Sequence, residues 1–349
     1  MAGLEALRAR LVPLAKAFLV ALGDLYFATL FLWAGLRIFA WDRWGWVFLL
    51  NILSPFLFYP LPVVALIAMF VRRRKTWIAT GAAFIVLVVS FGELLLPKIP
   101  RHPRSETSLR VMSYNVYGFS PDPDVVVRTV LAAKPDIVAF QELFPAVAEQ
   151  LHLQLAELYP YQVLDPKADV FGMGIISRDP IAPANEGLPG QWIGTPQVVS
   201  LELGQASVTL INFHAYAPNF AGQDFRSRVA RLDWSIRQQQ RQAEALAEFA
   251  AHRPQPLLVL GDLNAADQTR AYSIARRVLG DAWNEVGWGF GPTFSLHDLF
   301  GTASPLWAAR VDHIFHSSHW RALSAQLGTW DGQSDHRPVI AQLELNGPR

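Results

Sequence analysis

Ionisable and amide side chains recur directly after short apolar runs in the C-terminal two thirds of this 349-residue sequence. Such groups can orient water and transfer protons when they are brought together in one pocket. The positions are Asn115, Glu142, His214, Asp262, Asn264, Asp312, Asp335 and His336. Because the ends of neighbouring strands meet at one rim of a sheet, we expect these side chains to share a catalytic site.

The apolar runs themselves read as strands, and helical patterns alternate with them. We predict strands at 109–115, 136–141, 173–178, 198–203, 207–213, 257–262, 310–315 and 338–345. We predict helices at 125–134, 145–158, 226–252 and 268–278. This excess of strands over helices favours two packed sheets flanked by helices rather than one parallel sheet.

Seven short motifs follow one another in a fixed order between residues 109 and 346. They are SYNVYG, DIVAFQE, FGMGIISR, INFHAYAP, LGDLNA, RVDHIFHS and SDHRPV. In this order the sequence resembles the endonuclease/exonuclease/phosphatase superfamily, which includes pancreatic-type deoxyribonucleases, abasic-site endonucleases, neutral sphingomyelinases and inositol-polyphosphate 5-phosphatases. The resemblance implies an α+β fold, a four-layer α/β/β/α sandwich of two mainly antiparallel sheets.

The resemblance also implies a metal-dependent hydrolase of phosphoesters, with Mg²⁺ or Mn²⁺ as the cofactor. It assigns Glu142 as the principal metal ligand, helped by Asn115 and Asp335. Magnesium prefers oxygen ligands and keeps several waters, so one or two carboxylates suffice. A surface carboxylate is the alternative for Glu142, but its place directly after an apolar strand disfavours it.

The remaining roles are those that hydrolysis of an anionic phosphoester requires, namely an oriented water and groups that stabilise developing charge. By resemblance, Asp262 orients the water and Asn264 holds a phosphate oxygen. Asp312 and His336 form a pair in which the carboxylate raises the pKa of the imidazole, and His214 stabilises developing charge. A simple turn is the alternative for the GDLN segment, because Gly, Asp and Asn favour turns.

Two other groups of side chains attract attention but favour structural roles. The histidines at 313, 316 and 319 resemble a metal cluster, yet the first two alternate with apolar residues in a predicted strand, which disfavours zinc. Five arginines lie on the predicted helix 226–252, at Arg226, Arg228, Arg231, Arg237 and Arg241. Their spacing covers several helix faces and indicates a solvated helix, with contact of Arg226 or Arg228 to substrate phosphate as the alternative.

The first third of the chain has a different character. Three apolar stretches, 17–36, 46–71 and 77–97, each reach the roughly 20 residues needed to cross a bilayer of about 30 Å. Prolines at 55, 60 and 62 should kink or break the second helix. We therefore predict an all-α transmembrane anchor at 1–97, a linker at 98–108 and a catalytic domain at 109–349, rather than buried soluble helices or a cleaved signal peptide.

Cations flanking the apolar stretches indicate the orientation of the chain, because Lys and Arg are retained on the cytoplasmic side. Arg8, Arg10 and Lys16 precede the first stretch, and the Arg72–Lys75 cluster lies between the second and third. Three crossings then place the catalytic domain on the periplasmic or extracellular side of an inner or plasma membrane. Cations after the third stretch, in the 98–108 linker, favour the opposite orientation.

Charge is unevenly divided between the two parts. Residues 1–108 contain 12 Lys and Arg against 5 Asp and Glu, whereas residues 109–349 contain 18 against 24. An acidic domain does not favour bulk nucleic-acid binding, because that normally requires a basic face. The absence of cysteine excludes disulfides and thiolate zinc sites.

The expected partners are thus the lipid bilayer and a phosphoester substrate, which could be a lipid headgroup, a nucleic acid or a small phosphodiester; no obligate protein partner is expected. A nuclease acting on DNA or RNA remains an alternative function. A catalytically inactive, membrane-tethered binding module is another, although the retention of Glu142 and His336 argues against it.

Overall fold

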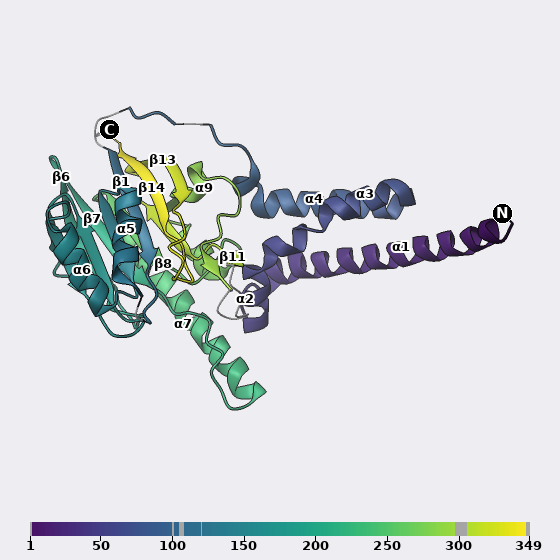
Figure 1. Cartoon of the computed structure of the whole chain (residues 1–349), viewed down its shortest axis with the longest axis horizontal. Coiled ribbons are helices and arrows are strands. Elements are labelled where there is room, and N and C mark those ends of the chain that lie inside the picture. The colour runs from purple at the N-terminus through teal and green to yellow at the C-terminus, as the bar shows by residue number, and fades with distance from the viewer. Residues whose placement is uncertain (1, 100, 105–107, 120, 297–305, 347–349) are drawn as a thin grey trace. The chain divides into compact units, whose positions relative to one another are not determined.

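The chain divides into two compact units, Met1–Glu93 and Leu94–Arg349. The computed structural model describes residues 2–99, 101–104, 108–119, 121–296 and 306–346 (Figure 1). Within these residues the first unit is helical, whereas the second contains both sheets and the candidate site. The positions of the two units relative to each other are not determined.

The N-terminal part of the chain forms a series of apolar helices. They are α1 (Ala2–Phe39), α2 (Gly45–Ile52), the 3₁₀ helix η1 (Ser54–Phe58), α3 (Leu61–Val71) and α4 (Arg74–Leu95). Three segments are long and apolar enough to cross a membrane, Leu11–Phe39, Ser54–Val71 and Arg74–Leu95. The first of them lies in a helix longer than the predicted 17–36, because the charged residues near the N-terminus do not end α1.

Prolines interrupt the second apolar stretch, as predicted. The α2 helix ends at Ile52, η1 carries Pro55 in its first turn, and α3 begins with Pro62 in its first turn. Proline is tolerated at these positions because the N–H groups of a first helical turn have no intrahelical partner. The stretch 46–71 is therefore two α-helices and a 3₁₀ turn rather than one continuous helix.

Two six-stranded sheets make up the core of the second unit. The first has the order β13-β14-β1-β2-β4-β3 and the second β5-β6-β7-β8-β12-β9. The first sheet contains β1 (Ser108–Asn115), β2 (Ile137–Gln141), β3 (Tyr161–Asp165), β4 (Met173–Ser177), β13 (Trp320–Leu327) and β14 (Val339–Leu345). The second contains β5 (Ile181–Pro183), β6 (Gln197–Leu203), β7 (Ala206–His214), β8 (Leu257–Asp262), β9 (Gly280–Asp281) and β12 (Asp312–His316). The pairs β1–β2 and β7–β8 are parallel, and the other pairs are antiparallel.

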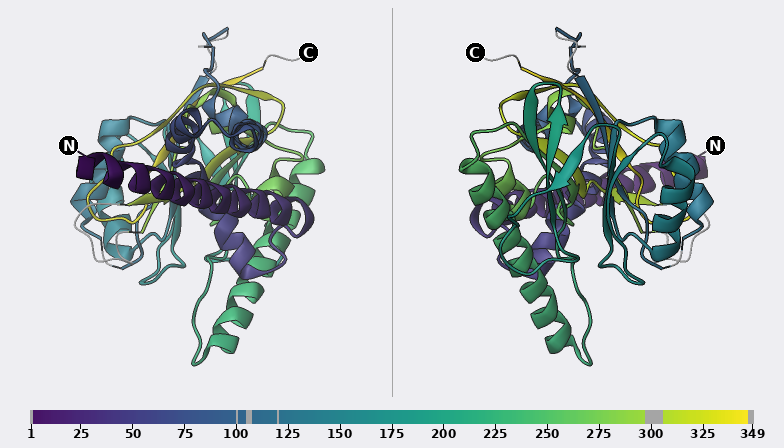
Figure 2. Two further views of the ribbon diagram at one scale, coloured as in Figure 1. Left: turned by 90° about the vertical axis from the view of Figure 1, so that its right-hand side faces the viewer. Right: turned by 90° about the vertical axis from the view of Figure 1, so that its left-hand side faces the viewer.

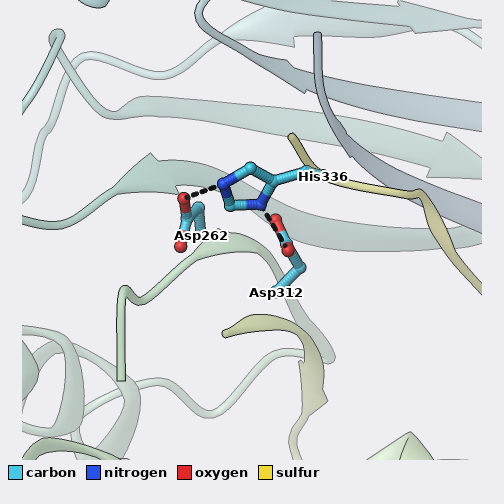
Figure 3. A group of neighbouring side chains, drawn as sticks. All are labelled: Asp262, Asp312 and His336. Carbon is cyan, nitrogen blue, oxygen red and sulfur yellow. Dashed lines mark hydrogen bonds and ion pairs between the residues drawn. The ribbon is translucent and has the colours of Figure 1, made fainter. Parts of the chain in front are cut away.

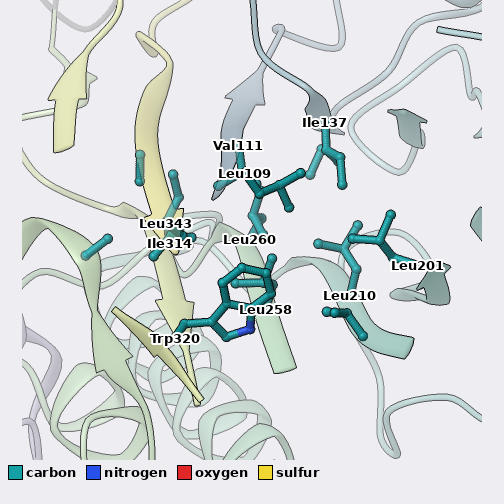
Figure 4. Close-up of a cluster of buried hydrophobic side chains, with 14 of the residues drawn as sticks. Leu109, Val111, Ile137, Leu201, Leu210, Leu258, Leu260, Ile314, Trp320 and Leu343 are labelled. Carbon is teal, nitrogen blue, oxygen red and sulfur yellow. The ribbon is translucent and has the colours of Figure 1, made fainter. Parts of the chain in front are cut away.

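The sheets stack face to face and helices cover their outer faces, as Figures 1 and 2 show. Alternation along β1 sends Leu109 and Val111 into the core between the sheets (Figure 4) and Met112 and Tyr114 toward the helices. The helices over the first sheet are α5 (Pro123–Ala133) and α6 (Pro145–Leu155), and those over the second are α7 (Phe225–Ala251) and α8 (Arg270–Ala275). The predicted α/β/β/α sandwich is confirmed.

All the strands predicted from the sequence are present, with bounds that differ by two residues or fewer. Several short or partly exposed elements were not predicted. They are β3, β5, β9, β13, the small β10–β11 pair (Phe294–Ser295 and Trp307–Ala309) and the helix α9 (Ala282–Val286). The unpredicted β13 still buries Trp320 in the core between the sheets.

Candidate active site

The register of the strands places the predicted polar side chains at one rim of the sandwich. In the first sheet, parallel pairing sets Asn115 beside Gln141, so that Glu142 follows at the same end. In the second sheet, β8 pairs with β7 and β12 in a register that places Asp262 opposite both His214 and Asp312. The rim is thus built from the two central strands of each sheet and their neighbours.

Asn115 joins the two sheets through its side-chain amide. Its Nδ2 donates to Glu142 Oε1 at 3.0 Å and to Asp262 Oδ2 at 3.3 Å. The other Glu142 oxygen accepts from the backbone N of Gly118 at 2.8 Å, and Asn115 Oδ1 accepts from the backbone N of Tyr117 at 3.1 Å. Glu142 and Asn115 are therefore held in fixed orientations before any ligand binds.

Asp312, His336 and Asp262 form a buried cluster, drawn in Figure 3. His336 Nδ1 lies 2.8 Å from Asp312 Oδ2, and its Nε2 lies 3.8 Å from Asp262 Oδ2 and 3.9 Å from Asp335 Oδ1. Burial by itself lowers the pKa of His336, but the charges of the three carboxylates outweigh it and raise that pKa well above its usual range. The imidazole is therefore held as a cation near neutral pH.

A serine in the SDH motif links His336 to the first sheet. Ser334 Oγ donates to the backbone carbonyl of Asn115 at 2.9 Å and accepts from the backbone N of His336 at 3.0 Å. The Ser334 N–H in turn donates to Asp331, whose other oxygen accepts from the hydroxyl of Tyr114. These supporting groups were not predicted, although Ser334 lies within a motif that the sequence singles out.

Thr293 is a further supporting residue that was not predicted. Its Oγ1 accepts from the backbone N of Val311 at 3.0 Å and of Asp312 at 3.1 Å. It thereby fixes the start of β12 from a loop 18 residues earlier in the chain. No spacing or motif around Thr293 signals this role, because the contact exists only in the folded chain.

His214 and Asp262 lie against each other at the end of β7 and β8. His214 Nε2 is 3.5 Å from Asp262 Oδ2 and 3.9 Å from Glu142 Oε1. Burial lowers the pKa of His214 despite the nearby Glu142 charge, so this imidazole is neutral, in contrast to His336. Burial, followed by the charge of Asp312, raises the pKa of Asp262 well above its usual range.

Two of the site residues adopt left-handed backbone conformations. The φ angles are 57° at Glu142 and 53° at Asn264. Asn264 closes a turn in which its backbone N donates to Asp262 Oδ1 at 2.7 Å, while its Nδ2 donates to the carbonyl of Ala215 at 3.0 Å. The GDLN segment is thus a turn and also part of the rim. Positive φ in a residue such as Glu, which rarely adopts it, is typical of functional sites.

The geometry agrees with a comparison against protein families. Residues 112–336 match the model of the Endonuclease/Exonuclease/phosphatase family. The chain belongs to this family. Membership supports a phosphoester hydrolase, as the sequence predicts. A comparison with curated protein sequences gave no significant match.

Solved structures share the fold of this endonuclease/exonuclease/phosphatase protein. The family member from Beutenbergia cavernae is 20% identical, with a TM-score of 0.50 over 69% of this chain and 72% of that one. The member from Bacteroides vulgatus is 18% identical, with a TM-score of 0.52 over 69% and 100%. Truncated TDP2 from Caenorhabditis elegans is also 18% identical, with a TM-score of 0.51 over 68% and 98%.

The family depends on divalent metals, and the donor groups of this chain fit such an ion. Glu142, Asp262 and Asp312 bring three carboxylates to one rim, and Asp262 and Asp312 are at most 1% exposed. Glu142 and the side-chain carbonyl of Asn115, which accepts from the Tyr117 N and has a second lone pair, offer the oxygen donors that Mg²⁺ prefers.

A second set of donors, Asp262, Asp312 and His336, has ligand atoms within 4.8 Å of one another. The hydrogen bond between Asp312 and His336 Nδ1 already uses one nitrogen of that ring, which favours an acid–base pair over a metal site here. For the predicted ligand Asp335, the described ion pair is with His336. Its role as a ligand remains a prediction.

The histidines at 313, 316 and 319 have partners of their own. His313 Nε2 contacts the Ala265 carbonyl at 2.9 Å, His316 Nε2 lies 3.1 Å from Glu285 Oε1, and His319 Nδ1 lies 3.0 Å from the Ser317 hydroxyl. These separate contacts agree with the structural roles predicted for all three.

A buried ion network lies behind the rim, centred on Arg310. Its guanidinium is 1% exposed, contacts Asp267, lies 2.8 Å from Asp281 Oδ2 and lies 3.1 Å from His313 Nδ1. Burial would raise the pKa of Asp281, but Arg310 holds that pKa far below its usual range. Because His313 contacts the carbonyl of Ala265, the network supports the turn that carries Asp262.

Arg310→Met is expected to destabilise the protein by about 3–5 kcal/mol, because it leaves the buried carboxylate of Asp281 and the partly buried carboxylate of Asp267 without their cation. The full chain in detergent should then unfold at a midpoint lower by roughly 6–20 °C. Because the pKa of Asp281 is lowered in the folded state, this stabilisation is present above a pH of about 3.9 and is lost as the pH falls further. The difference in unfolding midpoint between the wild type and Arg310→Met should therefore become smaller in acid. The control is Arg128→Met, at an exposed position on α5. Equal midpoints for the two variants at pH 7 would contradict the prediction.

Proposed function

We propose that the protein is a membrane-anchored, Mg²⁺-dependent phosphoester hydrolase that uses water as the nucleophile. The observation that carries the proposal is the convergence of the Asp312–His336 pair, Asp262 and the Glu142–Asn115 pair on one rim. Such a site offers positive charge, a base and oxygen donors within reach of one phosphate group.

In this mechanism each group of the rim has one task. Glu142 and Asn115, with Asp335 as the third predicted ligand, would hold the cation, which when bound neutralises charge on the phosphoryl oxygens. Asp262, whose pKa is raised, orients the attacking water and accepts a proton from it. His336, kept cationic by Asp312, stabilises the negative charge that develops on the phosphate.

The two remaining side chains bind the phosphate. His214 is neutral and lies beside Asp262, and it can donate a hydrogen bond to a phosphoryl oxygen. The side-chain amide of Asn264 lies at the same rim and binds another oxygen, exchanging its contact with the Ala215 carbonyl. Both residues thereby fix the phosphorus atom relative to the water that Asp262 orients.

A test of the activity uses the full chain purified in detergent. We expect hydrolysis of bis(p-nitrophenyl) phosphate with Mg²⁺ or Mn²⁺, loss of that activity in EDTA and recovery when the metal is restored. Comparison with p-nitrophenyl phosphate separates diesterase from monoesterase activity. Turnover that is equally fast in EDTA would overturn the metal-dependent mechanism.

The same assay with natural substrates can identify the substrate class. The acidic charge of residues 109–349 and the apolar helices support a lipid headgroup or a small phosphodiester over bulk nucleic acid. A panel of DNA, RNA, sphingomyelin and phosphoinositides decides between them. D. rerio TDP2, which is 15% identical with a TM-score of 0.51, has been solved with a single-strand DNA product, so the nucleic-acid arm of the panel is a necessary comparison.

We further propose that the protein is an integral membrane protein whose catalytic domain faces the periplasm or the extracellular space. The three apolar helices support an odd number of crossings. The cations of 8–16 and the Arg72–Lys75 cluster both lie on the cytoplasmic side only if the N-terminus is cytoplasmic. The second crossing is the weakest, because prolines divide it into η1 and α3.

Protease added to intact cells or spheroplasts is expected to digest the C-terminal domain, because an odd number of crossings carries it outward. The control is the same digestion after the membrane has been permeabilised, which should cleave the domain in either orientation. Protection of the C-terminal fragment until permeabilisation would indicate two crossings and a cytoplasmic domain, and the outward orientation would then be wrong.

A further inference from the structure

An exposed arm extends from the catalytic rim. It consists of residues 219–231, namely the loop before α7 and the first two turns of that helix, and it is called the α7 arm below. All its residues are exposed except the half-buried Ser227, and the first buried residue of α7 is Leu232. Figures 1 and 2 show this end of α7 extending away from the sandwich. The arm starts five residues after His214.

Local hydrogen bonds shape the arm, and Asn219 N at its start donates to Ser235 Oγ further along α7 at 3.1 Å. Asp224 and Ser227 form a capping box, in which Asp224 Oδ1 accepts from the Ser227 N at 2.7 Å and Ser227 Oγ accepts from the Asp224 N at 3.1 Å. Arg228 Nε donates to the Gly222 carbonyl at 3.1 Å and holds the loop against the helix. The arm is therefore preformed, and little conformational entropy is lost when it binds a partner.

The apolar stripe of α7 continues into this arm, where its side chains are exposed among the described residues. Leu232 and Ile236 are buried and lie on one helix face. Phe225 and Val229 precede Leu232 by seven and three residues, a spacing that places them on the same face. They are 83% and 38% exposed, and Phe220 in the preceding loop is 52% exposed.

Exposed cations flank this apolar stripe. With 100° per residue, Arg226 lies on one side of the Phe225–Val229 line and Arg228 on the other, and Arg231 lies beyond Arg228. Aromatic and aliphatic side chains bordered by arginines are typical of helices that lie in the headgroup region of a bilayer. There the arginines meet lipid phosphates while the apolar groups leave water.

We propose that the α7 arm is an interfacial anchor that inserts Phe220, Phe225 and Val229 among the headgroups of a bilayer that contains anionic lipid. This proposal rests on the membrane anchoring proposed above, which brings the domain to a bilayer, and not on the hydrolase activity. The acidic domain as a whole would be repelled by anionic lipid, so the basic arm selects the surface that approaches the membrane. Because the arm continues from His214, that surface includes the catalytic rim.

The test exploits the absence of cysteine from the chain. Phe225→Cys in the full-length protein gives a single attachment point for an environment-sensitive fluorophore such as NBD. The control is Leu153→Cys, at a leucine of α6 that is 65% exposed and lies over the other sheet. Both proteins are reconstituted into vesicles of phosphatidylcholine and phosphatidylglycerol that include a lipid with a nitroxide quencher close to its headgroup.

The label at 225 should emit at shorter wavelength and be quenched by the nitroxide lipid, whereas the label at 153 should not be quenched. The quenching at 225 should weaken in phosphatidylcholine alone and in an Arg226→Gln, Arg228→Gln background. The proposal would be overturned by absence of quenching at 225 or by equal quenching at both positions. It would also be overturned if the quenching at 225 changed neither with lipid charge nor with substitution of the two arginines.

Failure of the arm can be distinguished from failure of the anchoring on which it rests. A chain that does not float with the vesicles in a density gradient refutes the anchoring, and the arm proposal with it. A chain that floats while the label at 225 remains unquenched refutes the arm alone. Hydrolysis of a soluble diester by the labelled proteins reports independently on the proposed activity.

Discussion

Glu142→Ala is expected to lower Mg²⁺-dependent turnover by on the order of 10³-fold, because Glu142 is the proposed principal ligand of the metal, and such a ligand contributes several kcal/mol of transition-state stabilisation. The domain should stay folded. Glu142 is only partly buried, its removal opens no apolar core, and Asn115 Nδ2 keeps its hydrogen bond to Asp262 when the Glu142 acceptor is lost. The left-handed backbone of Glu142 suits alanine no worse than glutamate.

Two variants separate loss of the ligand from loss of structure. Glu142→Gln keeps an acceptor for the Gly118 N–H but removes the charge, so it should retain the fold and require far more Mg²⁺ for half-maximal rate. Glu149→Ala removes an exposed carboxylate from α6 and should behave as wild type. Circular dichroism reports on folding and initial rates report on turnover. Substantial Mg²⁺-dependent turnover by Glu142→Ala would remove Glu142 from the metal site.

The sequence predicted most of the fold because the central strands are nearly uninterrupted apolar runs. LLVLGD and IVAFQ are buried along their whole lengths, so their composition carries the signal. The edge strand β13 was missed because it mixes Arg321, Ser324 and Gln326 with apolar residues. Strands such as β9, with two residues, are defined by their pairing with β12 and have no pattern of their own.

The rim residues were predictable because each follows a recognisable strand, but the contacts among them were not. The bond from Asn115 to Asp262 joins two sheets across 147 residues of sequence. The different pKa shifts of His214 and His336 depend on which carboxylates the fold places beside each ring. Arg310 lies in the RVDHIFHS motif, yet its partners Asp267 and Asp281 come from other elements. Tertiary proximity decides these features, and a single sequence does not encode it locally.

The Asp312–His336 pair is expected to act as one unit. Asp312 Oδ2 holds His336 Nδ1 at 2.8 Å, and its charge opposes the effect of burial on the imidazole. Asp312→Ala would leave a buried imidazole without its hydrogen-bond partner at Nδ1 and without the largest of the charges that raise its pKa. His336→Ala would leave a buried carboxylate with nothing to orient. Each single variant should therefore lose the same contribution, on the order of 10²- to 10⁴-fold in turnover.

The double variant should be scarcely slower than the worse of the two singles, because groups that act together are strongly non-additive in rate. A control cycle pairs His336→Ala with Asn264→Ala, since the Asn264 side chain donates to Ala215 and makes no described contact with the Asp312–His336 pair. In that control cycle, the fold-loss in turnover of the double variant should lie much closer to the product of the fold-losses of the two single variants. Turnover measured under saturating Mg²⁺ decides between the two patterns. If the losses of Asp312→Ala and His336→Ala multiply in the double variant, then the two side chains contribute independently and the proposed pair is wrong.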